Sequence, residues 1–475
     1  MMRTHGAGTV RSSDGGASVT VAGWVGARRD HGGVVFLDLR DSTGVVQVVV
    51  DPEQAEIGDV HHIGREWVLQ IVGEVRPRPA GTVNPDLPTG EIEIAARGVT
   101  VLNRAEAPPF PLSDRGDDVD EVLRLRHRYL DLRRPSMQRN LRLRATVNRA
   151  LRASMFDQAF VEVETPMLIA STPEGARDFV VPSRLRPGDF YALPQSPQLF
   201  KQLLMVGGLD RYFQIARCLR DEDLRADRQF EFMQYDMEMS FADQEDVMAV
   251  VTIAVNAAVE AATGAPLPAV ARMTWSEAME RYGSDKPDVR FGMELVDLAE
   301  AVAGTEFNAF RADAVKGFCV TGGADASRST LDGLVDRARQ LGAAGLVWMR
   351  VKAAGELESP VAKFLSTVEQ GAITRALGAR AGDLVLIVAG ERRRTNTVLG
   401  ALRLHLGRPP LDEGDLAPLW VVDFPLFEAI SASGSPIPLH HPFTQPHPDD
   451  VGAEQMGDPT IAASWIAAYP NPHYS

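Results

Sequence analysis

Five short segments near the N-terminus alternate apolar and polar positions, and Gly and Asp turns separate them. A period of two predicts β-strands that bury one face and leave the other in water. Five strands in fewer than about 100 residues fit a small closed barrel. The expected strands cover residues 18–25, 33–41, 44–51, 67–75 and 90–102.

One face of this barrel is a candidate for binding nucleic acid. The most economical five-stranded barrel is the OB-fold. Barrels of this kind stack and read single-stranded bases with an exposed aromatic side chain beside arginines and amides. A core position for Phe36 is the open alternative, because most strand phenylalanines are buried. The expected face carries Arg29, Phe36, Gln47, Arg78 and Glu93.

A second pair of predicted strands encloses a densely charged loop. The flanking segments are RYFQIARCL (211–219) and FEFMQYDMEMSF (230–241). Arg220 would offer a planar fork to a phosphate, and Glu222 an acceptor to an amine. A solvated loop of self-neutralising charge is the plain alternative. The order strand, charged loop, strand favours a nucleotide clamp.

The rest of the chain divides into segments of different amino-acid composition. A proline-rich acidic stretch reads as a linker, and the segment after it predicts a mixed antiparallel sheet with helices. A later Ala-, Gly- and Val-rich region interrupts that segment like an insertion. The expected fold class is therefore α+β multidomain. The predicted boundaries are a barrel (1–104), a linker (105–123), the sheet domain (124–286), the insertion (287–418) and the resumed sheet domain (419–475).

Composition narrows the class of protein. A chain of 475 residues exceeds one compact core. The net charge of −15 argues against indiscriminate nucleic-acid binding. Residues 124–152 nevertheless form a basic island, which is equally typical of the polar face of a long helix. Cys218 and Cys319 fit no disulfide framework or zinc pattern. No run approaches a membrane span, so we expect a cytoplasmic protein.

Five segments, taken in order, resemble those of the bacterial type of aspartyl-tRNA synthetase, a class II enzyme. They are GWVGARRDHGGVVFLDLRD, FVEVETPML, ALPQSPQLFKQLLM, RCLRDEDLRADRQFEFMQYD and LHHPFTQP. The resemblance runs from near residue 1 to about residue 448. It implies an OB-fold anticodon-binding domain, a class II catalytic domain built on an antiparallel sheet, and the inserted α/β domain of bacterial members.

The same resemblance implies the reaction and its partners. L-Aspartate is activated with ATP to the aspartyl adenylate and transferred to tRNA(Asp), with Mg²⁺ expected alongside ATP. FVEVETP matches the dimer signature of the family, which places Pro166 at the two-fold axis of a homodimer.

The resemblance also assigns roles to matching residues. Arg220 is the catalytic residue that bridges the substrate carboxylate and the α-phosphate, and Lys201 is the cation for the side-chain carboxylate of aspartate. Asp223, Arg225, Asp227 and Arg228 are expected to contact ATP or the tRNA acceptor end, or to orient one another. The implied aspartate-binding residues are Glu174, Gln198, Lys201, Arg220, Asp236, His440 and His441; the ATP-binding residues are Arg220, Asp221, Glu222 and Gln229.

Two further barrel residues bear on the choice of tRNA. Relaxed members of the family, which also aspartylate tRNA(Asn), carry His and Gly at the positions of His31 and Gly81, so we expect the relaxed form. Both are also ordinary turn residues, and Gly81 can serve backbone geometry alone. The implied anticodon-binding residues are Arg29, His31, Phe36, Gln47, Arg78, Gly81 and Glu93.

The sequence departs from the family pattern in three places. Phe230 stands where proline is usual and Met233 where threonine is common, both conservative changes. After His447 the glycine-rich arginine segment and the acidic magnesium ligands have no counterpart. Three hypotheses follow: an aspartate–tRNA ligase truncated or altered at its C-terminus, a catalytically inactive tRNA-binding remnant, and a synthetase for asparagine or lysine. Lys201 with Asp236 disfavours the third.

Overall fold

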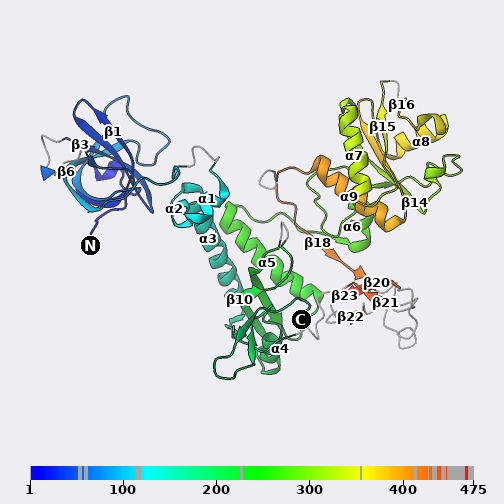
Figure 1. Ribbon diagram of the computed structural model, residues 1–475, viewed down its shortest axis with the longest axis horizontal. Coiled ribbons are helices and arrows are strands. Elements are labelled where there is room, and N and C mark those ends of the chain that lie inside the picture. The colour runs from blue at the N-terminus through cyan, green and yellow to red at the C-terminus, as the bar shows by residue number, and fades with distance from the viewer. Residues whose placement is uncertain are drawn as a thin grey trace. The chain divides into compact units, whose positions relative to one another are not determined.

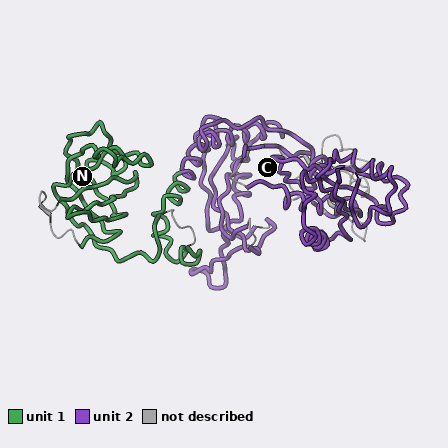
Figure 2. Tube along the Cα trace, turned by 90° about the horizontal axis from the view of Figure 1, so that it is seen from above, with its two compact units in different colours: residues 1–142 green, residues 143–475 purple. Residues whose placement is uncertain are grey.

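The computed structural model forms two compact units, residues 1–142 and residues 143–475 (Figure 1, Figure 2). The structure describes residues 2–51, 56–57, 62–113, 119–172, 174–224, 228–353, 356–410, 414–425, 427–430, 436–439, 445–446 and 466–468.

A closed β-barrel opens the first unit, as the alternating pattern predicts. The strands run in the order β3-β2-β1-β5-β6, and a parallel pairing of β3 with β6 closes the barrel, with the short β4 added to β6. The strands are β1 (Ser18–His31), β2 (Val34–Asp41), β3 (Gly44–Val50), β4 (Glu56–Ile57), β5 (Val68–Pro77) and β6 (Ile92–Asn103).

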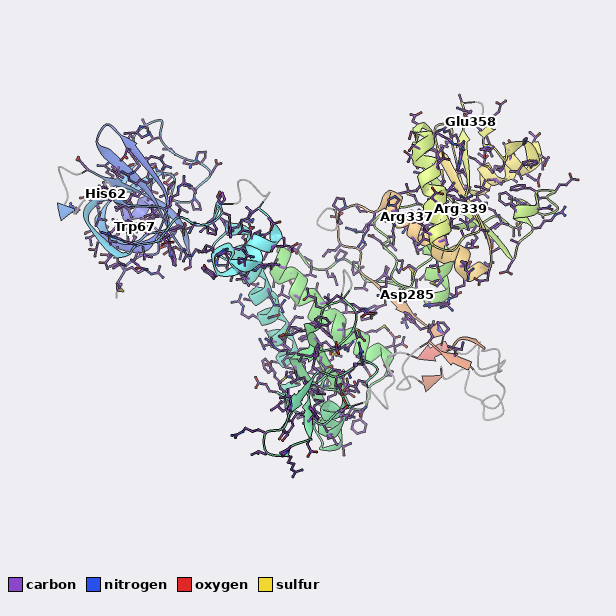
Figure 3. The ribbon with its side chains drawn as sticks, viewed as in Figure 1. His62, Trp67, Asp285, Arg337, Arg339 and Glu358 are labelled. Atoms are coloured by element: carbon purple, nitrogen blue, oxygen red, sulfur yellow. The ribbon has the colours of Figure 1, made fainter. Side chains whose placement is uncertain are left out.

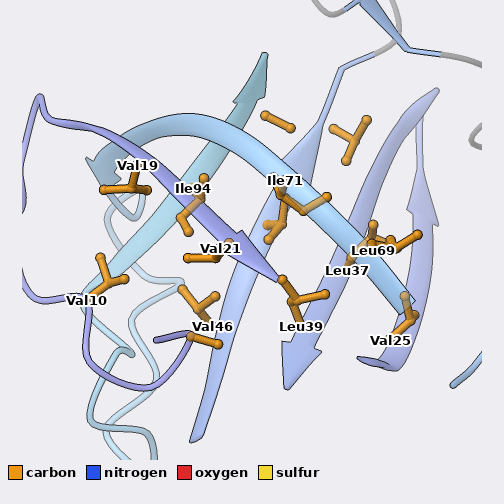
Figure 4. Packing of buried hydrophobic residues seen from close by; sticks show 14 of the residues in the cluster. Val10, Val19, Val21, Val25, Leu37, Leu39, Val46, Leu69, Ile71 and Ile94 are labelled. Carbon is orange, nitrogen blue, oxygen red and sulfur yellow. The ribbon is translucent and has the colours of Figure 1, made fainter. Parts of the chain in front are cut away.

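Alternate residues of these strands fill the barrel (Figure 4). Val19 and Val21 of β1 meet Leu37 and Leu39 of β2 in a core from which water is excluded. Because successive side chains point to opposite faces, the residue between two core positions faces outward. Phe36 lies between the buried Val35 and Leu37, so it is not a core residue.

Three helices follow the barrel within the basic island: α1 (Glu121–Arg126), α2 (Arg128–Asp131) and α3 (Pro135–Asp157). Proline at the first position of α3 suits a helix start, where its missing N–H costs nothing. The fully buried Asp131 accepts hydrogen bonds from Arg124 and Arg128. Part of the basic island therefore holds the helices together.

The second unit begins with an antiparallel pair of long strands, β10 (Arg211–Leu219) and β11 (Glu231–Met239), with β7 (Val161–Glu162) parallel to β10. One face of the pair packs on helices α3 and α5 (Gln244–Thr263). Its core joins Phe213 and Met239 to Met155, Val250 and Ala254. The other face carries polar side chains and is called here the open face, since Gln214 and Asp236 on it are partly exposed; Tyr212 and Glu238 on the same face are buried.

Helix α5 corrects one expectation. Its 20 residues, with a mean hydropathy of 1.5 over the most apolar window, are long and apolar enough to cross a membrane by length and composition. A single helix of this kind is weak evidence for a membrane span, and 22% of the window is buried within the described structure. Val250 and Ala254 of α5 are buried against the β10–β11 sheet.

A five-stranded sheet of order β13-β14-β17-β15-β16, antiparallel throughout, forms the centre of residues 296–390. The Val-rich runs of the predicted insertion supply its central strands, β15 (Val347–Val351) and β17 (Leu384–Gly390). Helices cover the sheet, and α7 carries the exposed Arg337 and Arg339 (Figure 3).

The remaining helices and strands are short. The strands are β8 (Val180–Pro182), β9 (Phe190–Ala192), β12 (Ala271–Thr274), β13 (Val296–Asp297), β14 (Ala314–Val320), β16 (Leu357–Glu358), β18 (Leu419–Val422), β19 (Phe424–Pro425), β20 (Phe427–Ile430), β21 (Pro436–Pro438), β22 (Gln445–Pro446) and β23 (Ile466–Ala468). The helices are α4 (Gln198–Val206), α6 (Trp275–Tyr282), α7 (Arg328–Gln340), α8 (Thr367–Ala376) and α9 (Arg392–Gly407), with 3-10 turns η1 (Ser12–Asp14), η3 (Asn308–Phe310), η4 (Gly323–Asp325) and η5 (Ala362–Phe364).

Candidate functional site

The open face of the β10–β11 pair gathers polar side chains by strand alternation. The register sets Gln214 opposite Asp236 and Tyr212 opposite Glu238. These even-numbered positions share one face because side chains repeat every two residues along a strand. The predicted site residues Asp236 and Arg220 therefore belong to one surface, at opposite ends of it.

Lys201 of α4 reaches this surface and is almost completely buried. Its Nζ lies 3.0 Å from Asp236 Oδ1 and 3.3 Å from Glu238 Oε2. Burial disfavours the charged form of Lys201, but the two carboxylates outweigh it and raise the pKa of the ammonium. Lys201 is thus a fixed cation between two anions.

The two carboxylates behave differently from exposed acids. Burial raises the pKa of Asp236 and of Glu238, and the nearby Lys201 opposes the rise. The cluster holds one positive and two negative groups when all are ionised, so it carries a net charge of −1. Such an imbalance suits a ligand that brings a cation.

Three buried atoms on this surface have no hydrogen-bond partner among the described residues. They are Asp236 Oδ2, Glu238 Oε2, which has only its ion pair with Lys201, and Arg220 Nε. The guanidinium of Arg220 also lies 5.1 Å from the ring centre of Phe232, which fixes its plane from one side. Unsatisfied buried polar atoms are costly and cluster where a ligand supplies the missing partner.

A segment of residues 174–178, called here the Glu174 segment, lies beside this surface. Glu174 accepts a hydrogen bond from Ser196 Oγ at 2.5 Å and from Thr172 Oγ1 at 3.1 Å. The backbone of Arg177 pairs with that of Asp221. The sequence-predicted Glu174 and Asp221 are therefore joined through one short segment.

The predicted clamp is only partly described. Arg220 is tied to the next strand through its backbone N–H, which donates to Phe230 O at 2.8 Å. Glu222 lies 3.5 Å from Arg228, and Gln229 is exposed. Gln198 occupies the first turn of α4, three residues before Lys201. The candidates Arg225, Asp227, His440 and His441 lie outside the described residues.

Cys218 is buried on the same strand face as Asp236. Burial raises the pKa of its thiol to about 11.

Magnesium finds no matching ligand set in the described part of the chain. There, no group of three His, Cys, Asp or Glu side chains could hold a metal ion. The described residues alone do not form a site for the ion, and no chemical step is routed through it.

The barrel carries a second candidate site, a hollow of about 520 Å³. His31 and Phe36 meet edge to face there, with ring centres 6.0 Å apart. Arg78 and Gly81 do not line the hollow, but Pro79 and Thr82 beside them do. The sequence-predicted residues that line it are Arg29, His31, Phe36, Gln47 and Glu93.

Several side chains of the hollow hold one another. Glu93 is buried and accepts hydrogen bonds from Gln47 at 3.0 Å and from Arg76 at 2.8 Å. Arg29 forms a two-point pair with Asp38 at 2.7 and 2.9 Å. A base entering the hollow therefore meets polar groups that are already oriented.

Sequence reasoning missed some residues of both sites. Glu238 and Tyr212 share the strand face of Asp236, so the period of two could have found them. In the barrel, Asp38 accepts hydrogen bonds from the predicted Arg29, and Arg76 donates one to the predicted Glu93. Gln195 forms its contacts across 17 and 19 residues, and local pattern gives no signal of these.

Two family models match the chain. The model described as tRNA synthetases class II (D, K and N) matches residues 120–465, and that described as OB-fold nucleic acid binding domain matches residues 19–102. In one-letter code, D, K and N stand for aspartate, lysine and asparagine.

Curated relatives match along nearly the whole chain. Proteins named aspartate–tRNA(Asp/Asn) ligase from Moorella thermoacetica, Saccharopolyspora erythraea and Acidothermus cellulolyticus are 52, 50 and 51% identical. The matches cover 94, 98 and 99% of this chain and 76, 78 and 80% of those proteins. A solved asparaginyl-tRNA synthetase from Pyrococcus horikoshii aligns over 86% of this chain and 98% of that one, with a TM-score of 0.49 and 18% identity.

The family models and the curated relatives agree with the resemblance drawn from the five segments, and they do not favour the inactive remnant. The chain belongs to the class II tRNA synthetase family of aspartate, lysine and asparagine, among its aspartate–tRNA ligases.

Proposed function

We propose that the open face of the β10–β11 sheet binds L-aspartate and ATP and forms the aspartyl adenylate. An α-carboxylate oxygen of aspartate attacks the α-phosphorus, the bond to the β-phosphate oxygen breaks, and pyrophosphate leaves. A ribose hydroxyl at the 3′ end of tRNA then attacks the activated carbonyl carbon, and AMP leaves. Arg220 offsets the negative charge that builds up between the two anionic reactants.

The single observation that supports this assignment most is the unpaired Asp236 Oδ2 beside the buried Lys201. Lys201 engages one oxygen of Asp236, and the other accepts no hydrogen bond from the part of the chain that the structure describes. The substrate ammonium supplies the missing partner to Oδ2, while its side-chain carboxylate meets Lys201. Gln198 and Glu174 are assigned to the same ligand, and Asp221, Glu222 and Gln229 to ATP.

Lys201 also accounts for the choice of aspartate over asparagine. A buried ammonium stabilises a carboxylate far more than a neutral amide of the same size. Asparagine would in addition present an N–H₂ group to the cation. The discrimination is therefore electrostatic rather than steric.

We assign the barrel hollow to the anticodon. His31 and Phe36 offer ring faces and edges for stacking, and Arg29 and Gln47, which also line the hollow, offer hydrogen-bond donors. The tRNA substrates are tRNA(Asp) and, in the relaxed form, tRNA(Asn), the pair that the names of the relatives carry. The predicted divisions, 1–104, 105–123, 124–286, 287–418 and 419–475, remain our assignment of domains.

We further assign a homodimer, Mg²⁺ as the ion that accompanies ATP, and a cytoplasmic location. For the dimer, the support is apolar surface near Pro166. Phe156 of α3 and Val161 of β7 are 53 and 45% exposed, although both are large and apolar. Exposed patches of this kind favour a protein partner.

Pyrophosphate exchange tests the assignment. The full chain should exchange pyrophosphate into ATP when aspartate is present, and asparagine or lysine should not replace it. Lys201→Leu should raise the KM for aspartate roughly 100-fold, because breaking a buried ion pair typically costs about 3 kcal/mol or more. The KM for ATP should change little.

Two controls accompany that measurement. Lys201→Arg keeps the charge and should retain part of the aspartate response, and thermal unfolding reports whether each variant is folded. Unchanged aspartate affinity in a folded Lys201→Leu protein would show that another cation reads the side chain. Binding of tRNA without any exchange would return the inactive remnant to consideration.

A further inference from the structure

Gln195 is a buried amide whose hydrogen bonds hold the Glu174 segment in place. It is 1% exposed, and it precedes α4 in the PQSPQ run. Its Nε2 donates to Ala176 O at 2.9 Å and to Asp178 Oδ1 at 2.5 Å. Its Oε1 accepts from the Ala176 N–H at 3.0 Å. One side chain therefore satisfies both backbone groups of Ala176.

This pattern requires an amide. Only Asn and Gln present a donor and an acceptor side by side in a planar group, and Gln has the longer reach. A carboxylate of the same shape would set oxygen against the carbonyl of Ala176 and against Asp178. Because the group is buried, water cannot replace a lost partner without cost.

The segment that Gln195 holds is linked to the residues assigned to both substrates. The next residue, Ser196, donates to Glu174 Oε2, so the Glu174 segment is tied to the start of α4 at two points. One residue past Ala176, the Arg177 carbonyl accepts from the Asp221 N–H at 3.0 Å. The segment thus lies between α4, which carries Lys201, and the clamp that begins at Arg220.

We propose that Gln195 is a positioning residue that holds the Glu174 segment against the aspartate pocket. It touches neither reactant. It sets the backbone from which Glu174 reaches the pocket and from which Arg177 meets the clamp. The inference rests on the proposed aspartate site and adds a residue for which neither the motifs nor the comparisons give a role.

Gln195→Glu tests the proposal with almost no change in shape. It should raise the KM for aspartate about tenfold or more, because two buried donor contacts are lost. The KM for ATP and the kcat for exchange should change less than threefold. Ser171→Ala is the matched control, since it removes a neighbouring hydrogen bond to Asp178 and leaves the amide grip intact.

A second variant restores one contact in the opposite direction. In Gln195→Glu with Asp178→Asn, the new amide at 178 can donate to the new carboxylate. Part of the aspartate affinity should return, whereas Asp178→Asn alone should not improve it. A general loss of stability would instead lower kcat, and kcat/KM for both aspartate and ATP. Adding Asp178→Asn would not restore these values.

Hydrogen exchange gives a readout that needs no activity. The amides of residues 174–178 should exchange faster in Gln195→Glu than in the wild type, with and without aspartate, and Ser171→Ala should leave the Ala176 amide protected. Unchanged exchange there, or an equal rise in the KM values for aspartate and ATP, would overturn the positioning role. A wild-type chain with no aspartate-dependent exchange of pyrophosphate would instead overturn the proposed function.

Discussion

Arg220 combines a buried Nε that lacks a hydrogen-bond partner in the described part of the chain with an aromatic ring 5.1 Å from its guanidinium carbon. The ring limits how the guanidinium can turn, and the backbone bond to Phe230 fixes where the side chain starts. A pre-oriented cation needs little reorganisation when charge develops on a phosphate. The position of Arg220 thus suits the transition state of adenylate formation.

Arg220→Ala should abolish adenylate formation and leave tRNA binding nearly intact. The lost contact should raise the barrier by roughly 3 kcal/mol or more, which is at least about a hundredfold in rate. Pyrophosphate exchange and filter binding of tRNA measure the two effects. Arg220→Lys keeps the charge without the planar fork and should recover only part of the rate. Near-normal exchange in the alanine variant would contradict the role.

Strand alternation and motif matches predict some side chains of the site from the sequence. Lys201 forms an ion pair with Asp236, and Glu238 follows from the same period of two. Arg220 comes directly after β10, and its part in the same site stays a prediction. The hydrogen bonds between Gln195 and Ala176 depend instead on how two loops pack against each other. No local pattern encodes such a meeting, because it is decided by the tertiary fold.

At the scale of elements, Glu280 joins α6 to the sheet and helix that follow it. Its carboxylate accepts hydrogen bonds from Lys316 of β14 at 2.8 Å and from Arg392 of α9 at 2.7 and 2.9 Å. Gly283, with φ of +68°, lets the end of α6 approach α9 so closely that a Cβ would lie 2.0 Å from Asn396 O. Helix α6 is therefore fixed to residues predicted to form the insertion.

This junction could not be predicted from the sequence. Four of the five predicted barrel strands agree with the structure to within two residues at each end, because each follows from its own alternation and turns. The first strand continues six residues past its predicted end, to His31. The partners of Glu280 lie 36 and 112 residues away, and only the fold brings them together. Gly283 reads as an ordinary helix C-cap, and its second role, close approach to α9, appears only in the structure.

Glu280→Gln should lower the free energy of unfolding at pH 7 by roughly 2 kcal/mol, since it leaves the buried Lys316 without its carboxylate. Solvent screening limits the loss, because a third of the Glu280 side chain is exposed. Asp336→Asn is the matched control in an exposed pair with Arg339, and should change stability by less than about 0.5 kcal/mol.

The effect of Glu280→Gln should depend on pH. Burial opposes ionisation of Glu280, but hydrogen bonds from Arg392 and Lys316 outweigh it and lower its pKa from 4.5 to about 2. A folded-state pKa below the unfolded one gives stability that is present above pH 4.5 and is lost as pH falls toward 2. Thermal unfolding of the full chain at pH 7 and pH 3 should show the gap to wild type shrinking, and a gap that widens would refute the pairing.

At the scale of the whole molecule, the two proposed sites lie in different units. The pocket around Lys201 lies within residues 143–475 and the barrel hollow within residues 1–142. Substitutions in the hollow should therefore change the choice of tRNA without changing pyrophosphate exchange. Each site can be tested with the other as an internal control.

We predict that the full chain aspartylates tRNA(Asn) as well as tRNA(Asp). The two anticodons differ at one base, so the choice depends on few contacts, each worth about 1 to 3 kcal/mol. His31 lines the hollow beside Phe36, and Gly81 has φ of +83° with open space where a side chain would lie. His31→Ala should change the ratio of the two charging rates by roughly fivefold or more. Arg97→Ala removes a charge that does not line the hollow, and should affect both tRNAs alike. Charging of tRNA(Asp) with tRNA(Asn) at background, at equal tRNA concentrations, would show that the enzyme is strict and that Gly81 serves only its turn.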